Sequence, residues 1–274
     1  MTAATRGRGA VAPWVWVQAV TLLVRRDLKL RYKNSALGFL WSFINPLMQI
    51  VVMTIVFKYI MGSTIKNFSV ELLTCLLPWT FFLQSLGDGT VCLIKDAVLI
   101  KKYPFPRILL PAAALGSNFV HMSLSFIVLL VVFLAVPVTM HWCFLWVLPL
   151  LFIQACLTLG VLMILSALQM YYEDVKFIIT WVLQVLFFLS PILYPVEQVL
   201  NSTRLTPLMK ELYIVGNPLA PLFIGYRTAL LHGAQWPVPG YFGYLGISIA
   251  WAALLLVVGT LVWRRYEWQF PEMV

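Results

Sequence analysis

The sequence predicts an all-α membrane protein with six transmembrane helices, and three observations lead to this. The mean hydropathy is +0.91. Hydrophobic residues make up 62% of the chain and charged residues 11%, whereas soluble domains are about half apolar and about a quarter charged. Several apolar stretches also reach the ~20 residues that a helix needs to cross ~30 Å of hydrocarbon. Each is expected to be helical, because lipid cannot pair with backbone polar groups.

The first expected element is an amphipathic helix over 13–33 that lies along the membrane surface. Its apolar part is too short to span, and cations follow it where a signal peptide would have a cleavage site. One helical face is polar, and the opposite face carries tryptophan and aliphatic residues, as in interfacial helices. Asp27 and Arg31 fall on the apolar side. They form either a local ion pair between positions i and i+4 or a contact with another protein surface.

Six stretches satisfy the length and composition of a spanning helix. With both chain ends in the cytoplasm, 14 of the 19 lysines and arginines lie on the cytoplasmic side, as the positive-inside rule predicts. A nucleic-acid-binding function is excluded, because the cations form no basic groove or known module. We expect a single transmembrane domain over 1–274. The six stretches are residues 36–60, 72–94, 108–136, 142–170, 176–195 and 241–263.

Five short motifs extend over nearly the whole chain. They are RRDLKLRYKNSALGFLW (25–41), Asn45-Pro46, PWTFF (78–82), LIKKYPFPRILLP (99–111) and FFLSPILYP (187–195). Together and in this order they resemble the ABC-type polysaccharide export permeases, which move O-antigen, capsular polymer or teichoic acid on a lipid carrier. The resemblance implies the fold of a type 2 ABC exporter permease, working as a homodimer with two ATPase subunits.

The energy source is expected outside this chain. No G-x-x-x-x-G-K-[ST] phosphate loop occurs, and no loop is long enough to hold a nucleotide-binding domain. ATP and Mg are therefore expected in a partner ATPase, and the chain is predicted to be a permease without cofactor or catalytic site. The histidines are scattered and the cysteines unpaired in the sequence, so no metal site is expected.

Residues 95–107 form the most substantial internal cytoplasmic loop. It is partly helical in pattern and ends at Pro104 and Pro106, which forbid continuation of a helix. In similar transporters the corresponding loop is a coupling helix that sits in a groove of the ATPase. A basic loop that pairs with anionic lipid is the alternative. The residues assigned to ATPase coupling are Asp96, Ala97, Val98, Leu99, Ile100, Lys101 and Lys102.

A sugar polymer offers apolar C–H faces and many hydroxyl groups, so aromatic side chains suit its passage better than fixed charges. Similar permeases build the conduit mainly from the first and fifth spans. Here this assigns Tyr32, Trp41, Phe43, Tyr59, Trp181, Phe187, Phe188 and Tyr194. The alternative is an aromatic belt or helix packing. The resemblance also makes the basic helix a candidate site for the lipid pyrophosphate, through Arg25, Arg26, Lys29, Arg31 and Lys33.

The segment 196–240 is neither a span nor plainly soluble. Asn217-Pro218 predicts a helix start and His232-Gly233 its end, which gives a helix too short to cross the bilayer. Residues 197–213 could form a partner helix. The resemblance identifies such a pair as gate helices that dip back from the outer face. A surface amphipathic helix is the alternative.

Polar residues inside the spans suggest contacts between helices. Asp88 is the only acid well inside a span, and it could drive a proton-coupled secondary transporter. No intramembrane basic or histidine relay and no paired broken helices accompany it, so a bond to a neighbouring helix is favoured. Hydrogen bonds between helices are also expected of Gln49, Gln84, Gln154, Gln169 and Gln184.

The function predicted is the transmembrane subunit of an ATP-driven exporter of lipid-linked polysaccharide in the bacterial inner membrane, with cytoplasmic termini. Its expected partners are a second copy, two ATPase subunits, membrane lipids and the lipid-linked polymer, and no nucleic acid. Two alternatives remain: a proton-coupled transporter that uses Asp88, and an ABC exporter of a small lipid or drug.

Overall fold

The computed structural model of the chain describes residues 13–270 except 34, 36, 63–66, 104, 136–141 and 234–235. Predictions that concern Pro104, His141, the His232 side chain and the two chain ends fall outside the described residues. The elements are α1 (Pro13–Tyr32), a 3-10 turn (Gly38–Leu40), α2 (Trp41–Thr54), a π-helix (Ile55–Ile60), α3 (Phe68–Thr90), α4 (Cys92–Lys95), α5 (Ala97–Lys102), α6 (Leu109–Ala135), a 3-10 turn (Trp142–Trp146), α7 (Val147–Gln169), α8 (Val175–Leu189), α9 (Val196–Leu200), α10 (Pro207–Gly216), α11 (Ala220–Arg227), a π-helix (Thr228–His232) and α12 (Tyr241–Tyr266).

The regular elements of the described residues are all helical, which confirms the predicted fold class. Five helical segments are long and apolar enough to cross a membrane. They match five of the six predicted spans to within a few residues. These segments are Trp41–Ile60, Phe68–Thr90, Leu109–Phe133, Trp142–Gln169 and Tyr241–Tyr266.

The fifth predicted span, 176–195, is shorter than expected. Its helix, α8, has 15 residues, which corresponds to about 22 Å. Ser190 ends it with an extended backbone (φ −97°, ψ 148°), because a residue that precedes proline avoids the helical region. The prediction of a continuous span through Pro191 is therefore wrong, and residues 190–195 form a turn that leads to α9.

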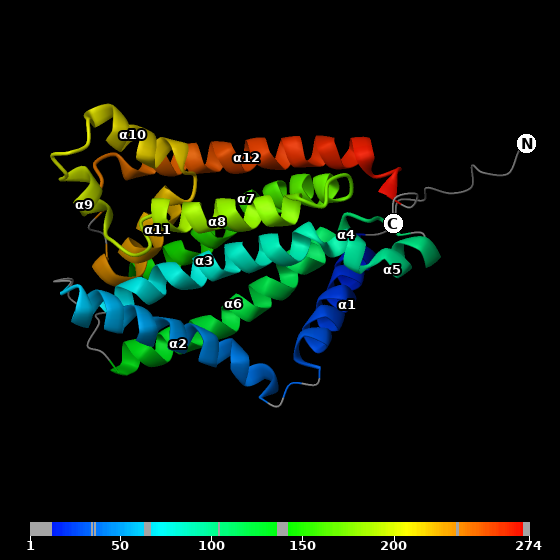
Figure 1. Cartoon of the computed structure of the whole chain (residues 1–274), viewed down its shortest axis with the longest axis horizontal. Helices are drawn as coiled ribbons and strands as arrows, with labels where there is room; N and C mark the ends of the chain where they lie inside the picture. The colour runs from blue at the N-terminus through cyan, green and yellow to red at the C-terminus, as the bar shows by residue number, and fades with distance from the viewer. Residues whose placement is uncertain are drawn as a thin grey trace, which may run out of the picture.

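The long helices form a bundle, and α1 crosses one end of it at a steep angle (Figure 1). This end also carries α4 and α5, and we call it the α5 end; α9 and α10 lie at the opposite, α10 end (Figure 1). The predicted helix over 13–33 is confirmed as α1. It packs mainly on α6 and leaves Trp14, Val17 and Leu22 exposed.

Helix α3 is the centre of the bundle. In the most apolar part of α3, 72% of the residues are buried inside the chain. In the corresponding part of the segment Trp41–Ile60, only 11% are buried. Helices α6 and α7 cover α3, and α12 packs along α7. Helices α2 and α8 also touch α3 but bury little of their own surface. The core thus consists of α3, α6, α7 and α12, with α2 and α8 attached to it.

Helices α7 and α12 make a close contact at two glycines. A Cβ added to Gly160 would lie 2.5 Å from the backbone carbonyl carbon of Leu255. One added to Gly259 would lie 2.6 Å from the carbonyl oxygen of Gly160. Small residues are the usual means by which membrane helices approach this closely. The side chains of both helices then pack over their whole shared length.

Gln154 of α7 joins three helices through its buried amide. Its Nε2 donates to the carbonyl of Pro78 in α3 at 2.8 Å, and its Oε1 accepts from the Tyr226 hydroxyl of α11 at 2.7 Å. The predicted interhelical role is confirmed for this glutamine. Gln169 donates only to the nearby Glu173 carbonyl. Gln49, Gln84 and Gln184 make no side-chain hydrogen bond to any residue that the structure describes.

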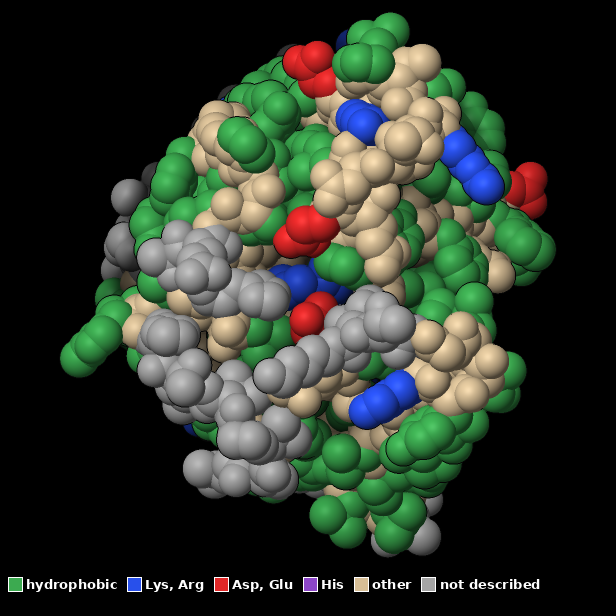
Figure 2. All heavy atoms as spheres, turned by 90° about the vertical axis from the view of Figure 1, so that its left-hand side faces the viewer, with side chains coloured by type: hydrophobic (Ala, Val, Ile, Leu, Met, Phe, Trp, Pro, Cys, Tyr) green, Lys and Arg blue, Asp and Glu red, His purple; other side chains and the backbone are tan. Residues whose placement is uncertain are grey.

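The outer segment contains three short helices at the α10 end. The predicted partner helix 197–213 is instead two helices, α9 and α10, and Thr206 caps α10 by accepting from Met209 N. Helix α11 inserts between α3, α7 and α12 with its side chains buried. The alternative of a surface amphipathic helix is therefore wrong for α11. Figure 2 views this end and shows acidic and basic side chains meeting in a hollow among hydrophobic ones.

Candidate functional site

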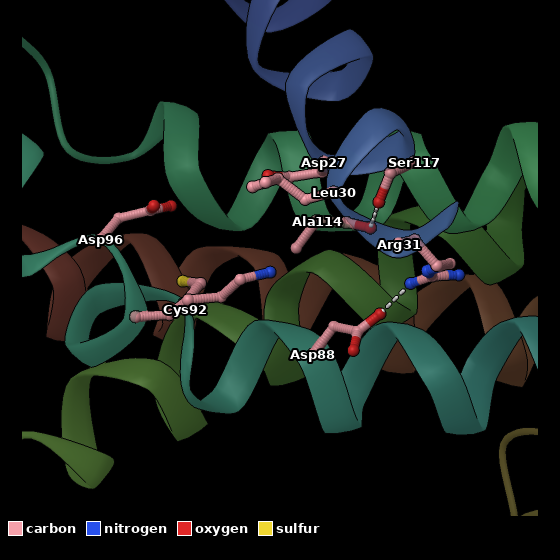
Figure 3. A pocket seen from close by; sticks show the side chains of 9 residues that line it. Asp27, Leu30, Arg31, Asp88, Cys92, Asp96, Ala114 and Ser117 are labelled. Carbon is pink, nitrogen blue, oxygen red and sulfur yellow. Dashed lines mark hydrogen bonds and ion pairs between the residues drawn. The ribbon is translucent and has the colours of Figure 1, made fainter. Parts of the chain in front are cut away.

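Three helices meet at a polar cluster near the α5 end. Arg31 of α1 forms an ion pair with Asp88 of α3, and it also donates to Asn118 Oδ1 of α6 at 3.0 Å. The amide of Asn118 donates in turn to Asp88 Oδ2 at 3.0 Å. Figure 3 shows Arg31 and Asp88 pointing toward each other from facing helices. The predicted bond of Asp88 to a neighbouring helix is confirmed.

The predicted local pair between Asp27 and Arg31 is wrong. Asp27 pairs with its neighbour Arg26 at 2.9 Å, because Arg31 turns toward α3 and α6. Arg26 also reaches Asp96 Oδ2 at 2.6 Å, just before α5. Burial alone would lower the pKa of Arg26, but the hydrogen bonds to Asp96 and Asp27 outweigh it and raise the pKa. Arg26 and Arg31 thus hold α1 against the end of α3 and the start of α5.

Between these ion pairs lies a pocket of about 310 Å³. Asp27, Arg31, Asp88, Lys95 and Asp96 contribute its charged groups. Figure 3 labels the arginine and the three aspartates among them. Cys92 also faces it, and burial raises the pKa of this thiol, so it stays neutral. The described residues contain no group of three or more His, Cys, Asp or Glu side chains that could hold a metal ion.

The five predicted headgroup cations fall into two sets. Arg26 and Arg31 are engaged in the ion pairs above, whereas Arg25, Lys29 and Lys33 are exposed and form no ion pair within the described part of the chain. Arg25 and Lys29 lie four residues apart on α1 and therefore share one helix face, and Lys33 comes directly after the helix.

The predicted conduit residues occupy two separate places. Tyr32 and Trp41 line a second pocket beside Arg31, of about 350 Å³. Tyr59 is exposed on the π-helix that follows α2, and Trp181 and Phe188 are exposed on α8. Both α2 and α8 pack on α3. The remaining predicted residues are Phe43, which is half-buried, Phe187, whose ring packs on Trp79 at 5.4 Å, and Tyr194, whose hydroxyl donates to the Phe188 carbonyl at 3.0 Å.

The predicted coupling segment forms the short helix α5. Ile100 is buried and Leu99 packs beside the same cluster of apolar residues at the α5 end. Asp96 is engaged with Arg26. The outward-facing positions are Val98, which is 65% exposed, and the exposed cations Lys101 and Lys102, while Ala97 is half-buried. An apolar side chain between cations is thus presented at the tip of this end.

Sequence reasoning missed a buried arginine at the α10 end. Arg227 is one of the five cations outside the predicted cytoplasmic segments, yet it is 6% exposed. It donates to the carbonyls of Ile192 and Tyr194 at 3.0 and 3.1 Å. Its Nε lies 3.7 Å from the Glu71 carboxylate of α3. The sequence did contain a signal of this burial, because Arg227 is the only charged residue in the otherwise uncharged run 212–231.

The comparisons with known proteins agree with this arrangement. The model of the ABC-2 type transporter family matches residues 18–231. The chain is 31% identical to the O-antigen export system permease protein RfbA of Myxococcus xanthus, over 92% of this chain and 94% of that protein. It is 29% identical to the protein of the same name from Klebsiella pneumoniae, over 93% and 94%. The polysialic acid transport protein KpsM of Escherichia coli is 24% identical, over 92% and 95%.

The family model extends from α1 to the π-helix that follows α11, and thus includes the polar cluster, α5, α8 and the buried arginine. With five helices that are long and apolar enough to cross a membrane, the chain is a multi-pass membrane protein. The resemblance inferred from the five motifs is confirmed: the chain belongs to the ABC-2 type transporter family.

Proposed function

We propose that this chain is the membrane subunit of an ATP-driven exporter of lipid-linked polysaccharide, such as O-antigen, capsular polymer or teichoic acid, in the bacterial inner membrane. The observation that carries the proposal is the extent of the likeness. O-antigen export permeases match 92 to 93% of this chain over 94% of their own length. The cargo of those relatives is a polymer of sugars, and this chain offers polar pockets and exposed aromatic side chains.

The proposed transporter contains two copies of this chain and two copies of a separate ATPase, which binds ATP and Mg. No phosphate-binding loop occurs in this chain. The exposed apolar faces of α2 and α8 offer surface for a second copy. The α5 end faces the cytoplasm in this proposal, because most of the cations lie there. The native mass of the purified complex tests the two-plus-two composition, and a single copy of this chain would contradict it.

Helix α5 is proposed to contact the ATPase through Val98, Lys101 and Lys102. Val98→Asp would place a carboxylate in an apolar contact without disturbing the fold, because the side chain is 65% exposed. We expect binding of the ATPase to weaken about tenfold or more and export to fall with it. Co-purification of the ATPase with the chain measures this.

Val98→Thr is the matched control, since it keeps the branched shape without adding a charge, and it should retain the ATPase. Undiminished ATPase binding by Val98→Asp would contradict a contact at this helix.

Two further roles belong to this proposal. The exposed cations Arg25, Lys29 and Lys33 receive the pyrophosphate of the lipid carrier, with Arg26 and Arg31 holding α1 in place. The aromatic residues of α2 and α8 form the conduit, which a second copy would complete. The pairing of Asp88 with an arginine leaves little support for a proton-coupled transporter.

Depletion of the chain in its host tests the cargo. We expect lipid-linked polysaccharide to accumulate on the cytoplasmic side while surface polymer disappears, and re-expression of the chain should reverse both changes. Separate assays of polymer inside and outside the membrane measure this. Unchanged polymer on both sides would contradict the polysaccharide assignment and redirect the search to small lipids or drugs.

A further inference from the structure

A second pocket lies on the other side of Arg31 from the charged one. It has a volume of about 350 Å³ and lies between the end of α1 and helices α2, α3 and α6. Its polar wall contains Asn45, Gln84 and His121. The same three residues line a smaller cavity of about 60 Å³ that continues between α2, α3 and α6. The volume of the larger pocket falls in the lower part of the ~300–1,000 Å³ range that is usual for small-molecule sites.

The amides in this pocket have no partner in the described part of the chain. Neither Asn45 nor Gln84 makes a side-chain hydrogen bond there. Both lie in segments apolar enough to span a membrane, where an unpaired amide costs free energy. The amide of the neighbouring Asn118, by contrast, is paired, since it bonds to Asp88 and to the Ala114 carbonyl. The two amides are therefore available for a hydroxylated ligand.

Two aromatic side chains, Tyr32 and Trp41, also line the pocket. The Tyr32 hydroxyl lies 2.6 Å from Ser42 Oγ, and the Tyr32 ring stacks on His121 with centroids 6.4 Å apart. Trp41 lines the same pocket and is 43% exposed. Aromatic rings and unpaired amides that line one pocket suit a ligand with an apolar C–H face and hydroxyl groups at its edge. A pyranose ring has this chemistry.

The position of the pocket fits a sugar that is joined to a diphosphate. Arg31 lines both pockets, and the exposed Lys33 comes directly after the last residue of α1. We propose that this pocket binds the first sugar of the lipid-linked cargo, with Asn45 and Gln84 bonding to its hydroxyl groups and Trp41 covering its C–H face. The inference rests on the proposed function, in which the cations of α1 receive the lipid diphosphate.

The experiment compares two probes on the full chain in lipid nanodiscs: a polyprenyl diphosphate, and the same lipid with one hexose attached. We expect the wild-type chain to bind the hexose-bearing lipid about tenfold more tightly, the effect of one to two hydrogen bonds. Asn45→Leu and Gln84→Leu should each remove most of this preference without changing the affinity for the sugar-free lipid. Gln184→Leu, an exposed amide on α8 outside this pocket, should leave both affinities unchanged.

Three results would overturn the inference. Equal binding of the two lipids by the wild-type chain would show that no sugar is recognised. Equal weakening of both lipids by the leucine variants would show that the amides support the structure or the diphosphate site. Binding of neither lipid by the wild-type chain would contradict the proposed cargo and this inference together. Equal binding of both lipids would contradict this inference alone, so the two failures can be told apart. Gln84→Met serves as a second, more conservative variant, and the sugar-free lipid reports on its folding.

Discussion

The variant Gly259→Val is expected to destabilise the chain by about 3 kcal/mol or more. A Cβ at this position would lie 2.6 Å from the carbonyl oxygen of Gly160. Backbone atoms cannot move aside as a flexible side chain can, so α12 would have to separate from α7. This contact is one of the most extensive between helices of the chain. Thermal unfolding in detergent, followed by the fluorescence of the 11 tryptophans, measures the effect.

The control lies on the same helix. A Cβ at Gly243 or Gly246 would have no atom within 4 Å, so alanine at either position should change the free energy of unfolding by no more than about 0.5 kcal/mol. A Gly259→Val chain with wild-type stability would mean that α7 and α12 do not meet at these glycines.

The variant Arg227→Met is expected to cost about 3–5 kcal/mol, the usual effect of removing one partner of a buried ion pair. The change removes the cation that faces Glu71 and the donor to the carbonyls of Ile192 and Tyr194. These carbonyls belong to the turn between α8 and α9, so we also expect faster proteolysis within residues 190–195. Unfolding curves and limited proteolysis of the purified chain give the two readouts.

Arg204→Met is the matched control, because Arg204 is exposed at the same end of the bundle. It should leave both readouts unchanged. Adding Glu71→Leu to Arg227→Met should recover part of the loss, since the paired change also removes the carboxylate that had faced the cation. Wild-type protection of the turn in Arg227→Met would exclude Arg227 as its anchor.

The sequence predicted the spans well because lipid requires a continuous apolar run wherever a helix crosses it. Four of the five spans that the structure contains begin and end within about four residues of the predicted limits, and α2 begins five residues late. The error at α8 has a local cause. The apolar run continues through residues 190–195, but Ser190-Pro191 ends the helix. The prediction gave more weight to the apolar composition than to this proline.

The polar contacts were harder to predict, since they depend on which helices meet. Spacing along α1 suggested a bond between Asp27 and Arg31, whereas Arg31 finds Asp88 at a sequence distance of 57 residues. Arg26 likewise finds Asp96 at a distance of 70. No pattern within one helix carries such information. Tyr32 and Trp41 were identified from the chemistry of a sugar polymer and from the spans that the family resemblance implies, while Asn45 was noted only within a motif and Gln84 only as an interhelical contact.

The weak burial of α2 and α8 has a consequence for how such proteins can diversify. Lipid tails solvate an apolar side chain about as well as another helix does, so the outward residues of α2 add little to the folding free energy of one chain. Substitutions on these faces therefore cost little stability. The inner helices α3, α6, α7 and α12 hold the fold, and α2 and α8 are left open to mutational drift. Under the proposed function, in which aromatic residues of these helices form the conduit, new cargo preferences can arise there without an unstable intermediate sequence.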